Sequence, residues 1–304
     1  MSLYLPLLLS AVFGVTAPLL AHRLPPQIAT WMLSIGGLFA AAGSSVTLGL
    51  LAFDALAQDP RLAARFGWSE GVLRAHHPVD VEAGAVAAAA VALFAVRFLI
   101  VGARRAGSVR QAHRLAAALS AGGGELSVIP SADRRAFAVP GRPGRIAVTT
   151  GMLRSLDGSQ RRALLAHERS HLLHHHHLHH TAVHLAASVN PLLRALPSAS
   201  ALATERWADE DAASVARRDT VAEALTRAAT GGHPAVGGVV LAAAAADVAD
   251  RVDALRAPPP RLALWRIGVS AMLLLAIAAA VAVAMHDTER LFELAQDAYR
   301  AGHR

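Results

Sequence analysis

In the stretch Ala163-Leu-Leu-Ala-His167-Glu168-Arg-Ser-His171, two histidines are four residues apart and a glutamate follows the first of them. Residues four apart lie on one face of a helix, so His167 and His171 can direct ring nitrogens at the same metal ion. Glu168 lies beside that face and can act as a general base on a water molecule without being a ligand. The stretch therefore predicts a helix that carries a catalytic Zn²⁺ site.

A second stretch, Thr204-Glu205-Arg-Trp-Ala-Asp209-Glu-Asp211-Ala, places two carboxylates at the same helical spacing. Glu205 is a candidate for the third zinc ligand, and Asp209 can accept a hydrogen bond from the free N–H of a ligating histidine. Two histidines and one glutamate leave a coordination position open, which is typical of a catalytic zinc site. An ordinary charged helix beside a chance motif is the alternative.

The composition excludes some kinds of site and partner. The chain has 304 residues, of which 54% are hydrophobic, and it contains no cysteine, which excludes disulfides and cysteine-ligated zinc. The net charge of +7 could indicate nucleic-acid binding. The arginines, however, gather in one loop between apolar segments that are long enough to cross a bilayer. We therefore expect the chain to contact a lipid bilayer and not to bind nucleic acid directly.

Four apolar segments are long enough to cross a bilayer. They predict a three-span region over residues 1–103 (spans 3–21, 28–53 and 83–103), a domain over 104–261, a fourth span within 262–285 and a tail over 286–304. The first segment could instead be a cleaved signal peptide, but it lacks a basic start and a clear cleavage site, which favours a retained span.

The second span is rich in small residues, among them Gly36, Ala40 and Gly43. Such residues allow helices to pack closely in lipid and could support a homo-oligomer. A sequence that is simply rich in alanine and glycine is the alternative.

The arginine distribution predicts the orientation. Residues 54–82 contain three arginines against five acids, whereas residues 104–261 contain twenty arginines against thirteen acids. We therefore expect a multi-pass protein of the plasma membrane with the 104–261 domain in the cytoplasm. Both termini and residues 54–82 are then outside.

The domain is predicted to be α+β, within a chain that is mostly α. A polar helix over 104–119 precedes three short strands, at residues 126–129, 136–139 and 146–149, and the last of these is the candidate edge strand for an extended substrate. The motif helix is expected from Ser159 to about Ser188, followed by helices over 204–217 and from Asp219 to residues 231–232. An apolar run at 235–246 is too short to span, and prolines 258–260 end the domain.

Residues 174–180 hold six histidines and one leucine. The tract could collect or deliver zinc. A solvated continuation of the motif helix is the simpler interpretation, because no glutamate accompanies its histidine pairs in the position of the base.

The combination of these features resembles a known family. The chain looks like the antirepressor metallopeptidases of the BlaR/MecR type, because it has three spans, then the segments 166–171 and 205–213, and then a final span. Strand-like segments at 138–141 and 148–153 also fit. The resemblance implies a gluzincin-like zinc peptidase that cleaves, directly or indirectly, a cytoplasmic DNA-binding repressor of the BlaI/MecI type. It implies the same roles for five residues: ligands His167, His171 and Glu205, base Glu168, and Asp209 orienting a ligating histidine.

The resemblance has one departure, and other functions remain open. Residues 286–304 hold no Ser-x-x-Lys motif, so covalent sensing of β-lactams is not expected. One alternative is an HtpX-type peptidase that acts on damaged membrane proteins. A second is a non-catalytic zinc-binding receptor or scaffold, and a weaker third is a zinc transporter. Candidates for stabilising an oxyanion are Arg217, Arg218 and His184.

Overall fold

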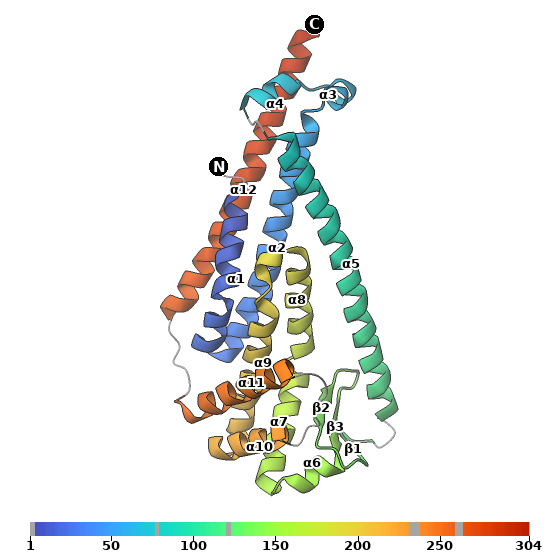
Figure 1. Ribbon diagram of the computed structural model, residues 1–304, viewed down its shortest axis with the longest axis vertical. Helices are drawn as coiled ribbons and strands as arrows, with labels where there is room; N and C mark the ends of the chain where they lie inside the picture. Colours follow the sequence, from blue (N-terminus) through green and yellow to red (C-terminus); the bar gives the residue numbers. More distant parts are fainter. Residues whose placement is uncertain (1–3, 77–78, 120–122, 231–237, 259–263, 304) are drawn as a thin grey trace.

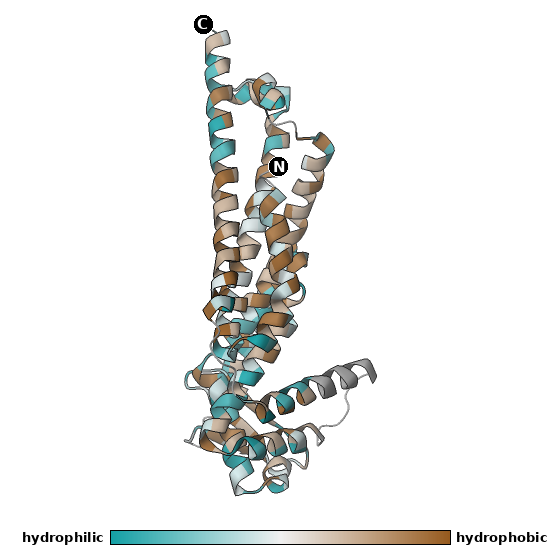
Figure 2. Ribbon diagram, turned by 90° about the vertical axis from the view of Figure 1, so that its left-hand side faces the viewer, coloured by the Kyte–Doolittle hydropathy of each residue, from teal (hydrophilic) through white to brown (hydrophobic). Residues whose placement is uncertain are grey.

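The computed structural model describes residues 4–76, 79–119, 123–230, 238–258 and 264–303. The molecule is elongated, with long helices above a smaller domain that contains the sheet (Figure 1). Within the described residues, four helices are long and apolar enough to cross a membrane: α1 (Leu5–Arg23), α2 (Pro26–Ala57), α5 (Val81–Ala118) and α12 (Leu264–Gly302). The prediction of a mostly helical protein with four spans is confirmed, and Figure 2 shows apolar residues concentrated along these helices.

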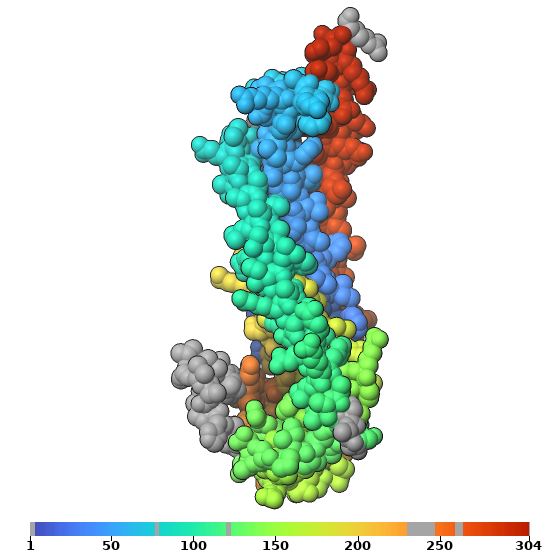
Figure 3. All heavy atoms as spheres, turned by 90° about the vertical axis from the view of Figure 1, so that its right-hand side faces the viewer, coloured from blue at the N-terminus to red at the C-terminus, as the bar shows by residue number. Residues whose placement is uncertain are grey.

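Two of the long helices continue beyond the apolar segments that predicted them. Helix α5 passes without interruption from the apolar segment into the polar helix that the sequence predicts over 104–119, and Figure 3 shows it along the outside of the molecule down to the domain. Helix α12 likewise continues through the tail to Gly302. At that end it packs against α4 (Glu70–His76), which follows α3 (Pro60–Phe66), and the backbone N–H of Ser69 donates to the carbonyl of Ala295 at 2.9 Å.

The sheet has its strands where the sequence predicts them, but in a different spatial order. It contains β1 (Leu126–Ile129), β2 (Ala136–Val139) and β3 (Arg145–Thr149) in the order β1-β3-β2. Strand β3 pairs parallel with β1 and antiparallel with β2, and all five of its residues are buried. The prediction that residues 146–149 form the edge strand is therefore wrong, because both sides of β3 are already paired. The edge strand that lies against the motif helix is β2.

The motif helix is shorter than predicted. After α6 (Thr150–Ser155), helix α7 (Gly158–Leu173) begins at a capping box in which Asp157, rather than Ser159, is the N-cap and Gln160 returns the hydrogen bond. The chain then breaks at His175, whose φ of 50° is left-handed. Helix α8 (His176–Val189) follows this break, so the single helix expected to Ser188 is two helices.

The remaining helices complete the domain. The 3-10 turn η3 (Pro191–Leu193) leads into α9 (Leu196–Val215), which begins well before the residue 204 that the sequence predicted. Then come α10 (Arg218–Thr230) and α11 (Gly238–Arg256). The predicted helix end at residues 231–232, the start of the apolar run at 235 and prolines 259 and 260 lie outside the described residues.

The hairpin of α8, η3 and α9 packs among the candidate spans rather than against the sheet (Figure 1). Its apolar residues share the largest described core cluster with α1, α2 and α12; they include Val183, Ala186, Leu193, Leu196 and Ala203. At the tip, the buried Asn190 Nδ2 donates to Ser44 Oγ at 2.7 Å, and Ser44 donates to Ser10 Oγ at 2.9 Å. Both apolar packing and buried hydrogen bonds therefore join the domain to the long helices.

The small-residue face of α2 is used inside this bundle. A Cβ added at Gly36 would meet Phe13 of α1, and one added at Gly43 would meet Ile277 of α12. Ala40 is fully buried. These contacts lie within one chain, so the face predicted to support a homo-oligomer is already covered. The homo-oligomer stays a prediction, and this face of α2 does not support it.

Close backbone approach of α1 to the hairpin predicts a glycine-specific effect. A Cβ at Gly14 would lie 2.0 Å from the carbonyl oxygen of Leu192, whereas a Cβ at Gly49 would meet nothing within 4 Å. We expect Gly14→Ala to lower the free energy of unfolding by about 1–3 kcal/mol because backbone must shift. Thermal unfolding of purified protein in detergent measures this, with Gly49→Ala as the control. Equal stability of the two variants would contradict this packing.

Candidate metal centre

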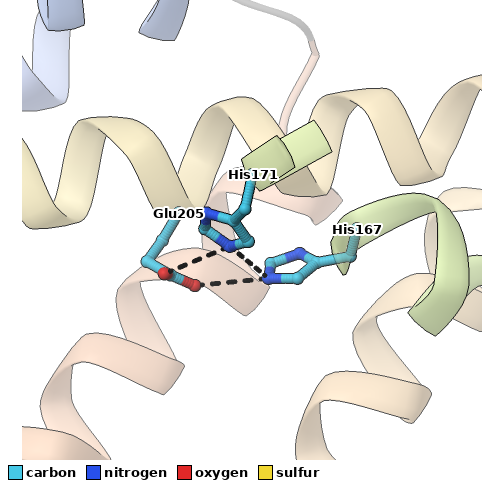
Figure 4. A group of neighbouring side chains, drawn as sticks. All are labelled: His167, His171 and Glu205. Carbon is cyan, nitrogen blue, oxygen red and sulfur yellow. Dashed lines mark hydrogen bonds and ion pairs between the residues drawn. The ribbon is translucent and has the colours of Figure 1, made fainter. Parts of the chain in front are cut away.

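The residues predicted as ligands come together where α7 faces α9 (Figure 4). His167 Nε2 lies 3.2 Å from His171 Nε2, and the Glu205 carboxylate lies 3.4 Å from His167 Nε2 and 3.5 Å from His171 Nε2. Among the described residues, these three form the one group that could hold a metal ion, with ligand atoms within 4.8 Å of one another.

The spacing of these atoms fits zinc. Nitrogen and oxygen ligands at about 2.0–2.1 Å from a tetrahedral ion are about 3.3 Å apart. The three separations of 3.2, 3.4 and 3.5 Å are close to that value. The donor set of two imidazoles and one carboxylate is also one that zinc accepts while keeping a position for a reactant.

Asp209 and Arg251 hold the first histidine and the glutamate in place. Asp209 Oδ1 lies 3.0 Å from His167 Nδ1, so the remaining nitrogen, Nε2, faces Glu205. Arg251 on α11 donates to both Asp209 oxygens at 2.8 Å and contacts Glu205 Oε2 at 2.9 Å. No motif surrounds Arg251 in the sequence, so only its position in the fold reveals this role.

The charges around His167 favour positive charge at the site. Burial by itself would lower the pKa of His167, but hydrogen bonds to Asp209 and Glu205 raise it to about 10. Burial dominates at His171, whose pKa is lowered to about 4. Burial alone would raise the pKa of Glu205, but the hydrogen bond to His167 and the charge of Arg251 have the larger effect and hold this pKa below its usual value. The two carboxylates therefore create a negative environment suited to a cation.

Glu168 is placed as a base and not as a ligand. Its side chain is buried beside the three candidate ligands and accepts a hydrogen bond from the backbone N–H of Ala138 in β2. Burial raises the pKa of its carboxyl above the usual value. A raised pKa suits a group that must take up a proton and later release it.

The histidine tract is not a solvated continuation of the motif helix. His176 and His179 are buried, because α8, which starts after the break at His175, packs against α2, α5 and α9. His179 Nδ1 lies 2.9 Å from Ser34 Oγ of α2, and His174 Nε2 lies 2.9 Å from Asp211. Most of this tract therefore serves contacts inside the protein.

A cavity of about 490 Å³ lies over the candidate ligands and Glu168. Strand β2 forms one wall with Ala136, Phe137 and Ala138, and α10 forms an apolar wall; His177, His180 and Arg251 are its polar neighbours. None of the three residues expected to stabilise an oxyanion lines it. Arg217 is 86% exposed, Arg218 is paired with Glu210 at 2.7 Å, and His184 lies farther along α8. His180, which is on the same helix as His184, does line the cavity.

The fold and the site together define a membrane-embedded metallopeptidase. The model of Peptidase family M48 matches residues 103–298, more than half of the chain, from α5 into α12. The chain therefore belongs to peptidase family M48. Searches of the curated proteins and of the solved structures found no match at a significant level. The predicted resemblance is confirmed as far as the metallopeptidase, whereas its BlaR/MecR type stays a prediction.

Metal analysis separates the roles of the two carboxylates on α9. We expect Glu205→Ala to lose most bound zinc, because a ligand is removed. We expect Asp209→Ala to bind zinc on the order of 10–100-fold more weakly, because the ligand His167 loses the group that orients it. Zinc content and chelator competition on purified protein measure both effects.

Glu210→Ala is the matched control, since Glu210 is on the same helix and pairs with Arg218. Wild-type zinc affinity in Glu205→Ala would rule out Glu205 as a ligand.

Proposed function

We propose that the chain is a zinc peptidase that hydrolyses a peptide bond of a protein substrate at the cytoplasmic surface of the membrane. One arrangement carries the proposal. His167, His171 and Glu205 converge on one point, and the buried carboxylate of Glu168 shares a cavity with them. A binding protein or a scaffold has no need of a base there, whereas peptide hydrolysis requires one.

The residues of the chain divide the chemistry among them. His167, His171 and Glu205 would hold Zn²⁺, which supplies Lewis acidity toward water and the scissile carbonyl. Glu168 takes the proton of the attacking water and passes it to the departing amine. The apolar wall from α10 limits the access of other water molecules.

Substrate binding follows from the edge position of β2. The N–H of Thr149 donates to the carbonyl of Arg135, so the antiparallel alternation turns the backbone groups of Ala136 and Ala138 away from β3 and toward the cavity. An extended substrate segment can pair with this edge as an added strand through the N–H and carbonyl of Ala136 and the carbonyl of Ala138, since the N–H of Ala138 already donates to Glu168. Phe137 and Ala138 are then the nearest neighbours of its side chains.

The hairpin sets the height of the site relative to the membrane. Asn190 at its tip binds Ser44, which lies about 27 Å along α2 from Pro26 at ~1.5 Å per residue. A hydrocarbon core is about 30 Å thick, so the hairpin extends far into the layer that α2 crosses. The metal centre, at the opposite end of the hairpin, then lies close to the membrane surface.

Two classes of substrate fit this position. The BlaR/MecR resemblance favours a cytoplasmic DNA-binding repressor of the BlaI/MecI type. A membrane protein, cleaved as in HtpX-type quality control, is the second candidate, and the insertion of the catalytic domain's own hairpin among the spans favours it. Either substrate would be cleaved in the same cavity, so an experiment that identifies the cleaved protein distinguishes the two.

Glu168→Gln is expected to keep bound zinc and to lose proteolysis, because Glu168 is the base and not a ligand. Comparing protein abundance in cells that express wild-type protein or Glu168→Gln identifies proteins that persist only in the mutant. A persisting soluble DNA-binding protein supports the repressor, and persisting membrane proteins support quality control.

Glu210→Gln, away from the cavity, is the control and should behave as wild type. Full proteolysis by Glu168→Gln would exclude the proposed mechanism.

The proposed orientation can be tested by cysteine labelling, because the natural chain has no cysteine. A membrane-impermeant maleimide should label Arg61→Cys and Arg290→Cys in intact cells, and Arg162→Cys only after permeabilisation. All three positions are exposed, so access is limited by the membrane alone. The reverse pattern would place the metal centre outside and remove a cytoplasmic repressor as substrate.

A further inference from the structure

Each ligating histidine has two ring nitrogens, and the structure provides a neighbour for the second one in both cases. For His167 this neighbour is Asp209, as the sequence predicts. For His171 it is a residue of the histidine tract: His176 Nδ1 lies 2.8 Å from His171 Nδ1. The two rings meet edge to face, with centroids 4.8 Å apart and an interplanar angle of 85°.

The direction of this hydrogen bond follows from the site. His171 directs Nε2 at Glu205 and His167, so a metal takes the lone pair of Nε2 and the proton must be on Nδ1. His171 Nδ1–H then donates, and His176 Nδ1 accepts. His176 must therefore be neutral, with its own proton on Nε2.

The surroundings of His176 suit a neutral ring. Its side chain is 1% exposed, and its Nε2 has no hydrogen-bond partner among the described residues. The ring packs against Trp207, with centroids 5.1 Å apart. A charged imidazolium without a carboxylate partner would be costly in this place.

The break in the chain is what brings His176 to this position. In an uninterrupted helix, a residue five positions after His171 would lie about 140° around the helix axis from it. The left-handed backbone of His175 ends α7 and starts α8 so that His176 faces back toward His171. The His-x-x-x-x-His spacing gives no indication of this contact by itself.

We propose that His176 is a positioning residue for the metal centre. Its Nδ1 accepts the proton of His171 Nδ1 and thereby fixes both the tautomer and the ring orientation in which His171 Nε2 is available as a ligand. The inference rests on the metal site of the proposed function, and it is independent of which protein is the substrate.

Zinc affinity of the full-length protein, purified in detergent, tests the proposal without relying on proteolysis. The probe is Zn²⁺ in competition with a chromophoric chelator. His176→Leu removes the acceptor and should raise the dissociation constant for zinc on the order of 10–100-fold. His176→Asn can place its side-chain oxygen where Nδ1 lies and should restore most of the affinity. His176→Gln places its oxygen one bond farther out and should not.

His179→Leu is the matched control. His179 is also a buried histidine of α8, but it contacts Ser34 and not a candidate ligand. This variant should lose stability while each folded molecule keeps wild-type zinc affinity. Thermal unfolding without metal, measured for every variant, separates the two effects.

The outcomes discriminate between roles. Wild-type affinity in His176→Leu would overturn the proposal, and so would equal weakening in His176→Asn and His176→Leu, since that result indicates packing rather than a hydrogen bond. Absence of zinc binding by the wild-type chain would overturn the metal site itself. Loss of proteolysis with unchanged affinity in all variants would also overturn the positioning role, while leaving the metal site standing.

Discussion

The contact of α9 with both the long helices and α7 is the constraint on which the molecule depends. The first turns of α9 carry Leu196, Ala199 and Ala203 into the core shared with α1 and α2. Its later turns carry Glu205 and Asp209 to the histidines of α7. One continuous helix therefore belongs to the bundle and to the metal centre, and the bundle fixes the height at which Glu205 meets α7. A peptidase domain built in this way is not a soluble unit attached to an anchor.

Electrostatics determines how the centre is held. Arg251 binds Asp209 through two hydrogen bonds and also contacts Glu205, so one cation steadies both carboxylates of α9. Asp209 in turn orients His167, and His176 is the corresponding neighbour of His171. Buried charges are tolerated when they are paired and hydrogen-bonded in this way. The arrangement leaves Nε2 of both histidines and the carboxylate of Glu205 directed at a common point.

Sequence patterns predicted the local features well and the long-range ones poorly. The four spans and the three strands lie where hydropathy and turn residues place them. The edge strand was wrong, because strand order depends on pairing between distant segments and not on the composition of β3. The uninterrupted motif helix was wrong as well, since the left-handed backbone of a single residue, His175, separates α7 from α8. Arg251 was missed because nothing near it in the sequence differs from an ordinary charged helix.

The sequence by itself determined what depends on helical and strand periodicity. His167 and His171 share a face because they are four residues apart, and the same holds for Glu205 and Asp209. Apolar length determined which helices can cross a membrane. Only the tertiary structure decided that these two faces meet, that β2 borders the cavity, and that His176 and Arg251 join the centre. The physical reason is that such contacts form between segments far apart in the chain, where a change of direction at one residue alters every later neighbour.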